Sequence, residues 1–134
     1  MCAERGDLMI LNGIEVVKGF NINDREQAFT EQILDGIKTE ETRKTHSLDC
    51  LIGKRVAIIR TGKGKAVIVG TCVISGCHEY RNRDEWNAAY NRHRVERGSR
   101  FDFTGRKVGY ILTEVERLES PLPVKSRGIV IRNI

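Results

Sequence analysis

Three charged side chains stand close together in the sequence, at Lys38, Glu41 and Arg43. A lysine that is partly withdrawn from water loses its proton more easily, so Lys38 can act as a base or a nucleophile, or can clamp a phosphate. Glu41 can accept from the exocyclic amine of a base, position Lys38 or transfer protons, and Arg43 offers a planar fork for phosphate or a carboxylate. The alternative is a solvated loop lysine beside a surface ion pair of little energetic value.

The residues before Lys38 are expected to form a helix. Asn23 can cap its free amides, and Glu26, three residues on, can bond back as in a capping box. Apolar side chains recur at four-residue intervals and give the helix a face that can pack on a sheet, at Phe29, Ile33 and Ile37. Gly36 is expected to end the helix in a left-handed turn.

Residues 39–43 alternate in the manner of a polar or half-buried strand. In a regular strand Thr39, Glu41 and Arg43 share one face, and Lys38 would lie on the other. Lys38 must therefore reach a common site from the turn that follows the helix.

Short apolar runs elsewhere in the chain predict β-strands. Residues 55–60 and 66–69 are separated by a loop with two glycines, residues 61–65, which predicts a β-hairpin. A phosphate-cradling loop would need the pattern G-x-x-x-x-G-K-[ST] entering a helix, and neither is present. Residues 10–22 suggest a strand followed by a turn. Residues 108–114 and 128–134 predict two further strands, and the prolines of residues 120–123 indicate an extended connector between them.

A second helix is expected to begin at Asn82, with Glu85 at the capping-box position. A stripe at helical spacing is interpreted as a seam that faces the core, with a base-stacking platform as the alternative; it consists of Trp86, Ala89, Tyr90 and His93. The surrounding residues 81–107 are the most basic part of the chain, which fits either a solvated helix face or a nucleic-acid footprint. His78, Tyr80 and Tyr90 are further candidates for a shared cleft.

The composition is that of an ordinary globular protein, with 40% hydrophobic and 31% charged residues. A length of 134 residues fits one domain, residues 1–134. The N-terminal residues carry charge, and no apolar run approaches about 18 residues, so a cytoplasmic location without a membrane partner is expected. The formal charge of +5 favours polyanionic partners such as RNA or single-stranded nucleic acid.

The cysteines are scattered, at positions 2, 50, 72 and 77, and no disulfides are expected. Zinc is one interpretation of Cys72, Cys77 and His78, because two thiols and an imidazole lie within a few residues. Structural zinc sites normally have a second pair of ligands elsewhere, and none is visible. Ordinary strand cysteines are the favoured interpretation, so neither a metal nor another cofactor is expected.

About five or six short strands with two helices indicate the α+β class, with a barrel or a strongly curled sheet. Residues 33–43 resemble the signature of the ASCH domain family, in the PUA-like superfamily. That signature is a helix end followed by G-x-K-x-x-E-x-R, and its fixed positions fall on Gly36, Lys38, Glu41 and Arg43. Later blocks agree in order with small bacterial and phage-type members, so the resemblance covers roughly residues 30–134.

The resemblance implies a PUA-like fold, in which a curled sheet forms a β-barrel with two flanking helices. It implies a cleft beside the signature that binds RNA or a modified nucleobase, with contacts from Gly36, Lys38, Thr39, Glu41, Arg43 and Arg81. If the protein is an enzyme, Lys38 and Glu41 are the expected catalytic pair. One branch of the family hydrolyses the acyl group of N4-acetylcytidine, and another member type has been described as a ribonuclease.

The chain departs from the amidohydrolase branch at two places. That branch has threonine where this chain has Glu41, and it uses an additional acidic residue in the later helix. The corresponding region here holds Asn87, Tyr90 and Asn91, with Asp84 and Glu85 as the nearest acids. The first hypothesis is therefore a module that binds RNA or a modified nucleotide. The second is a small hydrolase that acts on N4-acylated cytidine or on RNA, and the third is a structural or partner-binding protein.

Overall fold

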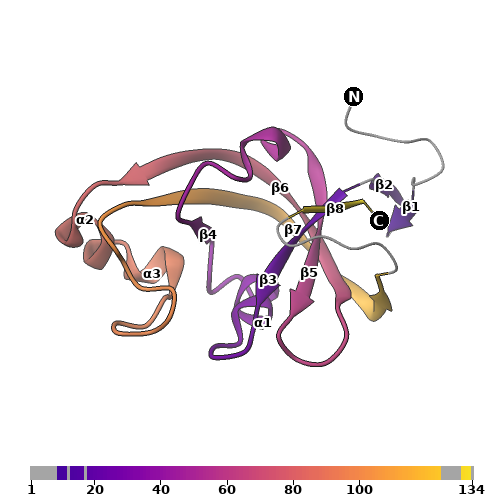
Figure 1. Ribbon diagram of the computed structural model, residues 1–134. Coiled ribbons are helices and arrows are strands. Elements are labelled where there is room, and N and C mark those ends of the chain that lie inside the picture. Colours follow the sequence, from indigo (N-terminus) through magenta and orange to yellow (C-terminus); the bar gives the residue numbers. More distant parts are fainter. Residues whose placement is uncertain (1–8, 12, 17, 125–130, 134) are drawn as a thin grey trace.

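The computed structural model describes residues 9–11, 13–16, 18–124 and 131–133 (Figure 1). In chain order the elements are β1 (Met9–Leu11), β2 (Ile14–Val16), β3 (Lys18–Asn23), α1 (Phe29–Leu34), β4 (Glu40–Arg43), the 3-10 helix η2 (Asp49–Leu51), β5 (Arg55–Thr61), β6 (Val67–Tyr80), α2 (Arg83–Ala88), α3 (Tyr90–His93), β7 (Lys107–Pro123) and β8 (Ile131–Asn133). Short helices lie between the strands of a largely antiparallel sheet, so the predicted α+β class is confirmed.

Six strands form one mixed sheet in the order β4-β7-β6-β5-β3-β8, while β1 and β2 pair separately. The strands β6 and β7 are 14 and 17 residues long and run side by side as the arch in Figure 1. Three register shifts interrupt their ladder, and such irregularities bend strands and increase their twist.

The expected closure into a β-barrel is not found. The edge strands β4 and β8 have four and three residues, and no ladder joins them within the described part of the chain. Edge strands this short offer few backbone groups for a closing ladder. The sheet is therefore strongly curled but open.

The predicted hairpin is confirmed. The antiparallel ladder of β5 and β6 runs from the pair Arg55 and Val73 to the pair Arg60 and Val67. Gly62 and Gly64 in the connecting loop have φ angles of +86° and +73°, which a side chain would strain. The proposed connector at residues 120–123 is instead the end of β7, where Pro123 pairs with Val67. Only part of the predicted strand at 128–134 lies among the described residues, as β8.

The first helix begins later than the sequence suggested. Asn23 is the last residue of β3 and pairs with Thr61, and its side chain accepts from the Arg25 amide at 2.8 Å. The helix begins only at Phe29, with Ala28 as its N-cap residue, so Asn23 lies too early in the chain to cap it. Asp24 accepts from the Thr30 amide at 3.1 Å, close to the start of α1. The predicted helix end is confirmed, because Gly36 has a φ angle of +79°.

The second helix begins as predicted, because the Asn82 side chain accepts from the Glu85 amide at 2.9 Å. It is divided at Ala89 into α2 and α3. Trp86, Ala89 and His93 are each 1% exposed, which confirms the core-facing interpretation for these three residues, whereas Tyr90 is only half-buried. None of the helices in the described part of the chain is both long and apolar enough to span a membrane.

Candidate functional site

A pocket of about 480 Å³ opens where β3, the start of α1, β4 and the segment after α3 meet. Its walls mix aromatic and aliphatic groups with amides, hydroxyls and four basic side chains. The lining residues are Asn21, Ile22, Asn23, Phe29, Lys38, Glu41, Thr42, Arg43, Lys44, Thr61, Val95, Phe101 and Lys107. Three of the four fixed residues of the G-x-K-x-x-E-x-R segment thus line one cavity.

Lys38 is buried against this pocket, with 2% of the residue exposed. Its Nζ donates to the backbone oxygen of His93 at 2.5 Å and lies 4.7 Å from the centre of the Phe29 ring. The Glu41 carboxylate is 4.0 Å away. Burial lowers the pKa of Lys38 from 10.5 to about 8, even though Glu41 and Glu40 favour the charged form. A neutral amine is therefore accessible at mildly alkaline pH.

The end of α1 explains how Lys38 reaches the pocket. The amides of Ile37 and Lys38 both donate to the Gln32 oxygen, at 2.8 and 3.0 Å, and close the turn around Gly36. Because β4 begins only at Glu40, the alternation of side chains between the two faces of the strand does not apply to Lys38. Lys38 approaches Glu41 from the turn, as the sequence predicted.

Arg43 contacts Glu41 and the backbone of β3. Its Nε donates to Glu41 Oε2 at 3.1 Å, and its Nη2 donates to the backbone oxygen of Asn21 at 2.5 Å. Nη2 also lies 3.0 Å from Glu41 Oε2. Arg43 therefore holds the Glu41 carboxylate in place. From the sequence, a contact between these two residues was expected only as a surface ion pair.

The backbone oxygen that binds Lys38 is held by a rigid aromatic cluster. The His93 ring stacks on Trp86, with centroids 3.8 Å apart and planes 16° from parallel. His93 Nδ1 accepts from the Val95 amide at 2.9 Å, so its Nε2 carries the proton and donates to the Trp86 oxygen at 2.8 Å. Burial lowers the pKa of His93, which keeps the ring neutral. The contact spans 55 residues and uses a main-chain atom, so no sequence motif could reveal it.

Lys107 adds a second buried amine, at the start of β7, with 2% of the residue exposed. Burial lowers its pKa, and the nearby charge of Lys44 lowers it further. From the sequence, Lys107 was assigned to the basic region of residues 81–107 and was not expected in the cleft. Phe29 and Phe101, which pack edge to face at 6.1 Å, were also missed as pocket residues. Their hydrophobicity indicated burial, but not which cavity they would line.

Other predicted residues lie away from the pocket. Gly36, Thr39 and Arg81 are exposed and do not line it. The Thr39 amide donates to the Arg92 oxygen at 3.0 Å, which fixes the start of β4. Asp84, the nearest later acid, is also exposed on α2.

His78 and Tyr80 serve a different cluster. They bind the buried carboxylate of Glu40 at 2.9 and 2.5 Å, and Arg92 binds the same group at 3.0 Å. Although burial opposes ionisation, these hydrogen bonds lower the pKa of Glu40. Glu40 points to the opposite side of β4 from Glu41. The predicted contribution of His78 and Tyr80 to the pocket is therefore not found.

Part of the basic stretch is neutralised within the protein. Arg83 Nη1 donates to both carboxylate oxygens of Asp102, at 2.9 and 3.0 Å. Burial acts against the charge of Asp102, but the amides of Gly98 and Phe103 together with Arg83 lower its pKa to about 2. Arg83 is therefore paired within the protein, while Arg81, Arg97, Arg100 and Arg106 of the same stretch are exposed.

The fold and the pocket define a small α+β domain in which a curled, open sheet carries a cavity lined by basic side chains. The family model of the ASCH domain matches residues 25–121, and the chain therefore belongs to the ASCH domain family. No curated protein sequence matches the chain.

Solved ASCH structures from Zymomonas mobilis share the fold. A serine-to-alanine mutant of ZmASCH is 16% identical, with a TM-score of 0.67 and 87% of each chain covered. The ASCH protein from the same organism is also 16% identical, with a TM-score of 0.60 over 79% of this chain and 73% of the other. A tyrosine-to-phenylalanine mutant is 17% identical, with a TM-score of 0.60 over 79% and 76%. These likenesses show that the chain shares the fold of the solved ASCH structures.

Proposed function

We propose that the protein binds RNA or a modified nucleotide and holds one nucleobase in the Lys38–Glu41 pocket. The observation that carries the proposal is the convergence of Lys38, Glu41 and Lys107 in one cavity with aromatic walls. Its volume of about 480 Å³ falls in the usual range of small-molecule pockets, about 300–1,000 Å³. A flat base would lie against the aromatic wall that Phe29 and Phe101 form while its edge meets the polar groups.

Each polar group has a role that follows from its chemistry. The Glu41 carboxylate only accepts hydrogen bonds, so it suits an exocyclic amine such as that of cytosine. The ammonium of Lys38 donates and suits a base carbonyl or a phosphate oxygen. Lys44 is exposed at the pocket and can contact a backbone phosphate, which fixes position rather than sequence. The excess of five positive charges supports a polyanionic ligand.

Binding can be tested by titrating short single-stranded RNAs and modified nucleosides into the protein and into Lys38→Met and Glu41→Gln. Loss of one hydrogen bond to a charged group predicts binding weaker by about 10- to 100-fold. Lys54→Met and Arg81→Ala are matched controls, because both residues are exposed and neither lines the pocket. Binding that is unchanged in both pocket variants, with the fold intact by circular dichroism, would contradict the proposed site.

A second candidate function is hydrolysis of an N4-acylated cytidine, and it is favoured by the lowered pKa of Lys38. Neutral Lys38 would take a proton from a water molecule whose oxygen attacks the acyl carbon. The exocyclic amine would leave and receive a proton, with Glu41 available to transfer it. The products are cytidine and a carboxylic acid, so one water molecule is consumed.

We favour the binding function because the pocket offers few carboxylates for proton transfer. Among its described lining residues Glu41 is the single carboxylate, and it is already paired with Arg43. Mass spectrometry of N4-acetylcytidine and short RNAs incubated with the protein separates the two functions. Turnover that Lys38→Met abolishes would establish the enzyme, whereas binding without turnover would leave the binding module.

A further inference from the structure

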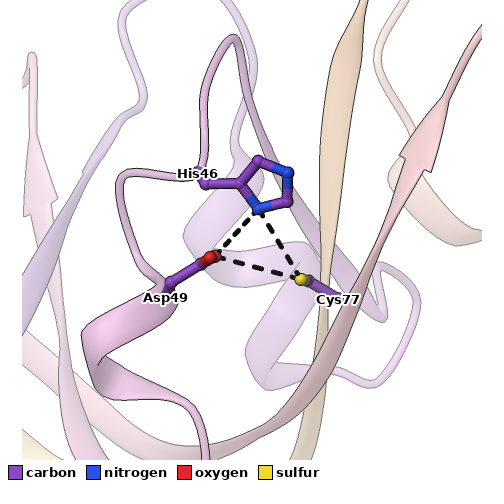
Figure 2. A group of neighbouring side chains, drawn as sticks. All are labelled: His46, Asp49 and Cys77. Atoms are coloured by element: carbon purple, nitrogen blue, oxygen red, sulfur yellow. Dashed lines mark hydrogen bonds and ion pairs between the residues drawn. The ribbon is translucent and has the colours of Figure 1, made fainter.

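A second group of chemically active side chains lies outside the pocket, at His46, Asp49 and Cys77 (Figure 2). His46 follows β4, Asp49 begins η2, and Cys77 lies on β6. His46 Nδ1 is 3.1 Å from Asp49 Oδ1, and Cys77 Sγ is 4.0 Å from the former and 3.9 Å from the latter. Two of the three residues are exposed and the third is partly exposed, so an ion can enter from solvent.

We propose that His46 Nδ1, Asp49 Oδ1 and Cys77 Sγ bind a zinc ion. A tetrahedral zinc ion with bonds of about 2.3 Å to sulfur and about 2.0–2.2 Å to nitrogen and oxygen holds its donors about 3.3–3.6 Å apart. The observed separations of 3.1, 3.9 and 4.0 Å differ from these values by a few tenths of an ångström. Small side-chain rotations of partly exposed residues can make that adjustment.

The residues around the three donors are arranged as partners of metal ligands. The other ring nitrogen of His46, Nε2, lies 2.7 Å from Glu79 Oε2. A proton held there leaves Nδ1 as the lone-pair donor, which is the usual carboxylate–histidine–zinc arrangement. The Tyr110 hydroxyl donates to Asp49 Oδ1 at 2.6 Å and orients that carboxylate. Both groups that flank Cys77 thus have a partner that fixes their direction.

The donor set selects the metal. A thiolate, an imidazole and a carboxylate suit zinc, whereas magnesium and calcium take oxygen ligands. Three protein donors leave a fourth position for a water molecule. The alternative occupant is a proton, which would make His46 an imidazolium held between Asp49 and Glu79. The zinc and proton alternatives make different predictions for Cys77, because only the metal needs its sulfur.

The site is tested with cobalt(II) as a spectroscopic probe, using reduced protein freed of metal by chelation and carrying no histidine tag. The wild type is expected to bind one equivalent and to show the thiolate-to-cobalt charge-transfer band, which one equivalent of zinc then removes. Cys77→Ser is expected to abolish the band. Cys50→Ser, which changes another exposed cysteine outside the cluster, is expected to retain it.

A calorimetric zinc titration provides the second measurement. Glu79→Gln is expected to weaken zinc binding by about 10- to 100-fold, the range for loss of a partner of a metal ligand. His78→Gln, on the same strand but bonded to Glu40, is the matched control and should bind as the wild type does. No thiolate band, a band that survives Cys77→Ser, or zinc affinity that is independent of both His46→Gln and Cys77→Ser would overturn the proposal.

Discussion

Lys38 is the residue whose burial sets the chemistry of the pocket. A buried ammonium loses hydration, and its attraction to a carboxylate only partly offsets that loss. Here the compensation comes from the oxygen of His93 at 2.5 Å and from Glu41 at 4.0 Å. Burying Lys38 therefore lowers the stability of the fold, as is common for residues that bind or react.

The pH dependence of stability should reveal this cost. Because the pKa of Lys38 is about 8 when folded and 10.5 ordinarily, the unfolded chain binds more protons between these values, and stability rises with pH there. The gap corresponds to at most about 3 kcal/mol. Urea unfolding of wild type and Lys38→Met at pH 7 and pH 10 should show the wild type gaining relative to the variant. Parallel pH profiles would contradict the buried, titrating lysine.

Arg43 is expected to act on the ligand through Glu41. Its Nε and Nη2 bond Glu41 and the Asn21 oxygen, so Arg43→Lys should release the carboxylate and weaken binding. In a double-mutant cycle with Glu41→Gln, measured by ligand titration, the two effects should not add, with a coupling of about 0.5–3 kcal/mol. Additive losses would instead indicate an independent contact between Arg43 and the ligand.

The strand β4 separates two polar clusters by alternation. Glu40 lies on one side, bonded to His78, Tyr80 and Arg92, and Glu41 lies on the pocket side. The neighbouring strand β7 permits this arrangement because Gly109 has no side chain. A Cβ at that position would lie 2.6 Å from Glu40 Oε1 and 2.9 Å from His78 Nε2.

Gly109→Ala is therefore expected to destabilise the protein. The clashing Glu40 carboxylate is held by hydrogen bonds and cannot rotate away without breaking them, so a loss of about 1–3 kcal/mol follows. Urea unfolding measures the loss. Gly76→Ala is the matched control, because a Cβ there would meet nothing within 4 Å. Equal stabilities of the two variants would refute this packing explanation.

At the scale of the whole molecule, the pocket collects charge from segments that are distant in the chain. Lys38 and Lys44 flank β4, while Lys107 comes from the start of β7. Arg83 and Arg92, by contrast, pair with internal acids. The long-range attraction for a polyanion thus comes from this opening together with exposed arginines of residues 81–107, such as Arg81, Arg97 and Arg106.

RNA binding should therefore weaken with salt, and Lys44 should contribute to that dependence. Each phosphate contact to a single strand contributes about 0.7 to the slope of log affinity against log salt concentration. Lys44→Ala should lower that slope by about this amount, whereas Arg83→Ala should leave it unchanged because Arg83 is paired with Asp102. Fluorescence anisotropy at several salt concentrations measures both slopes. Equal slopes for wild type and Lys44→Ala would exclude this phosphate contact.

The sequence alone determined the features that depend on neighbours along the chain. The turn at Gly36, the cap at Asn82 and the hairpin loop at residues 61–65 follow from backbone preferences and bonds within a few residues. The approach of Lys38 from the turn followed from strand alternation. The cap assigned to Asn23 failed because β3, paired with β5, continues through that residue and the helix begins only at Phe29.

Only the tertiary structure decided what surrounds these residues. The lowered pKa of Lys38, the addition of Phe101 and Lys107 to the pocket, and the open edge of the sheet all depend on segments far apart in sequence. The grouping of His46 with Cys77, 31 residues away, has the same origin. How far a side chain is withdrawn from water, and which side chains meet it, depends on atoms that are distant in the sequence. The spacing of neighbouring residues does not contain that information.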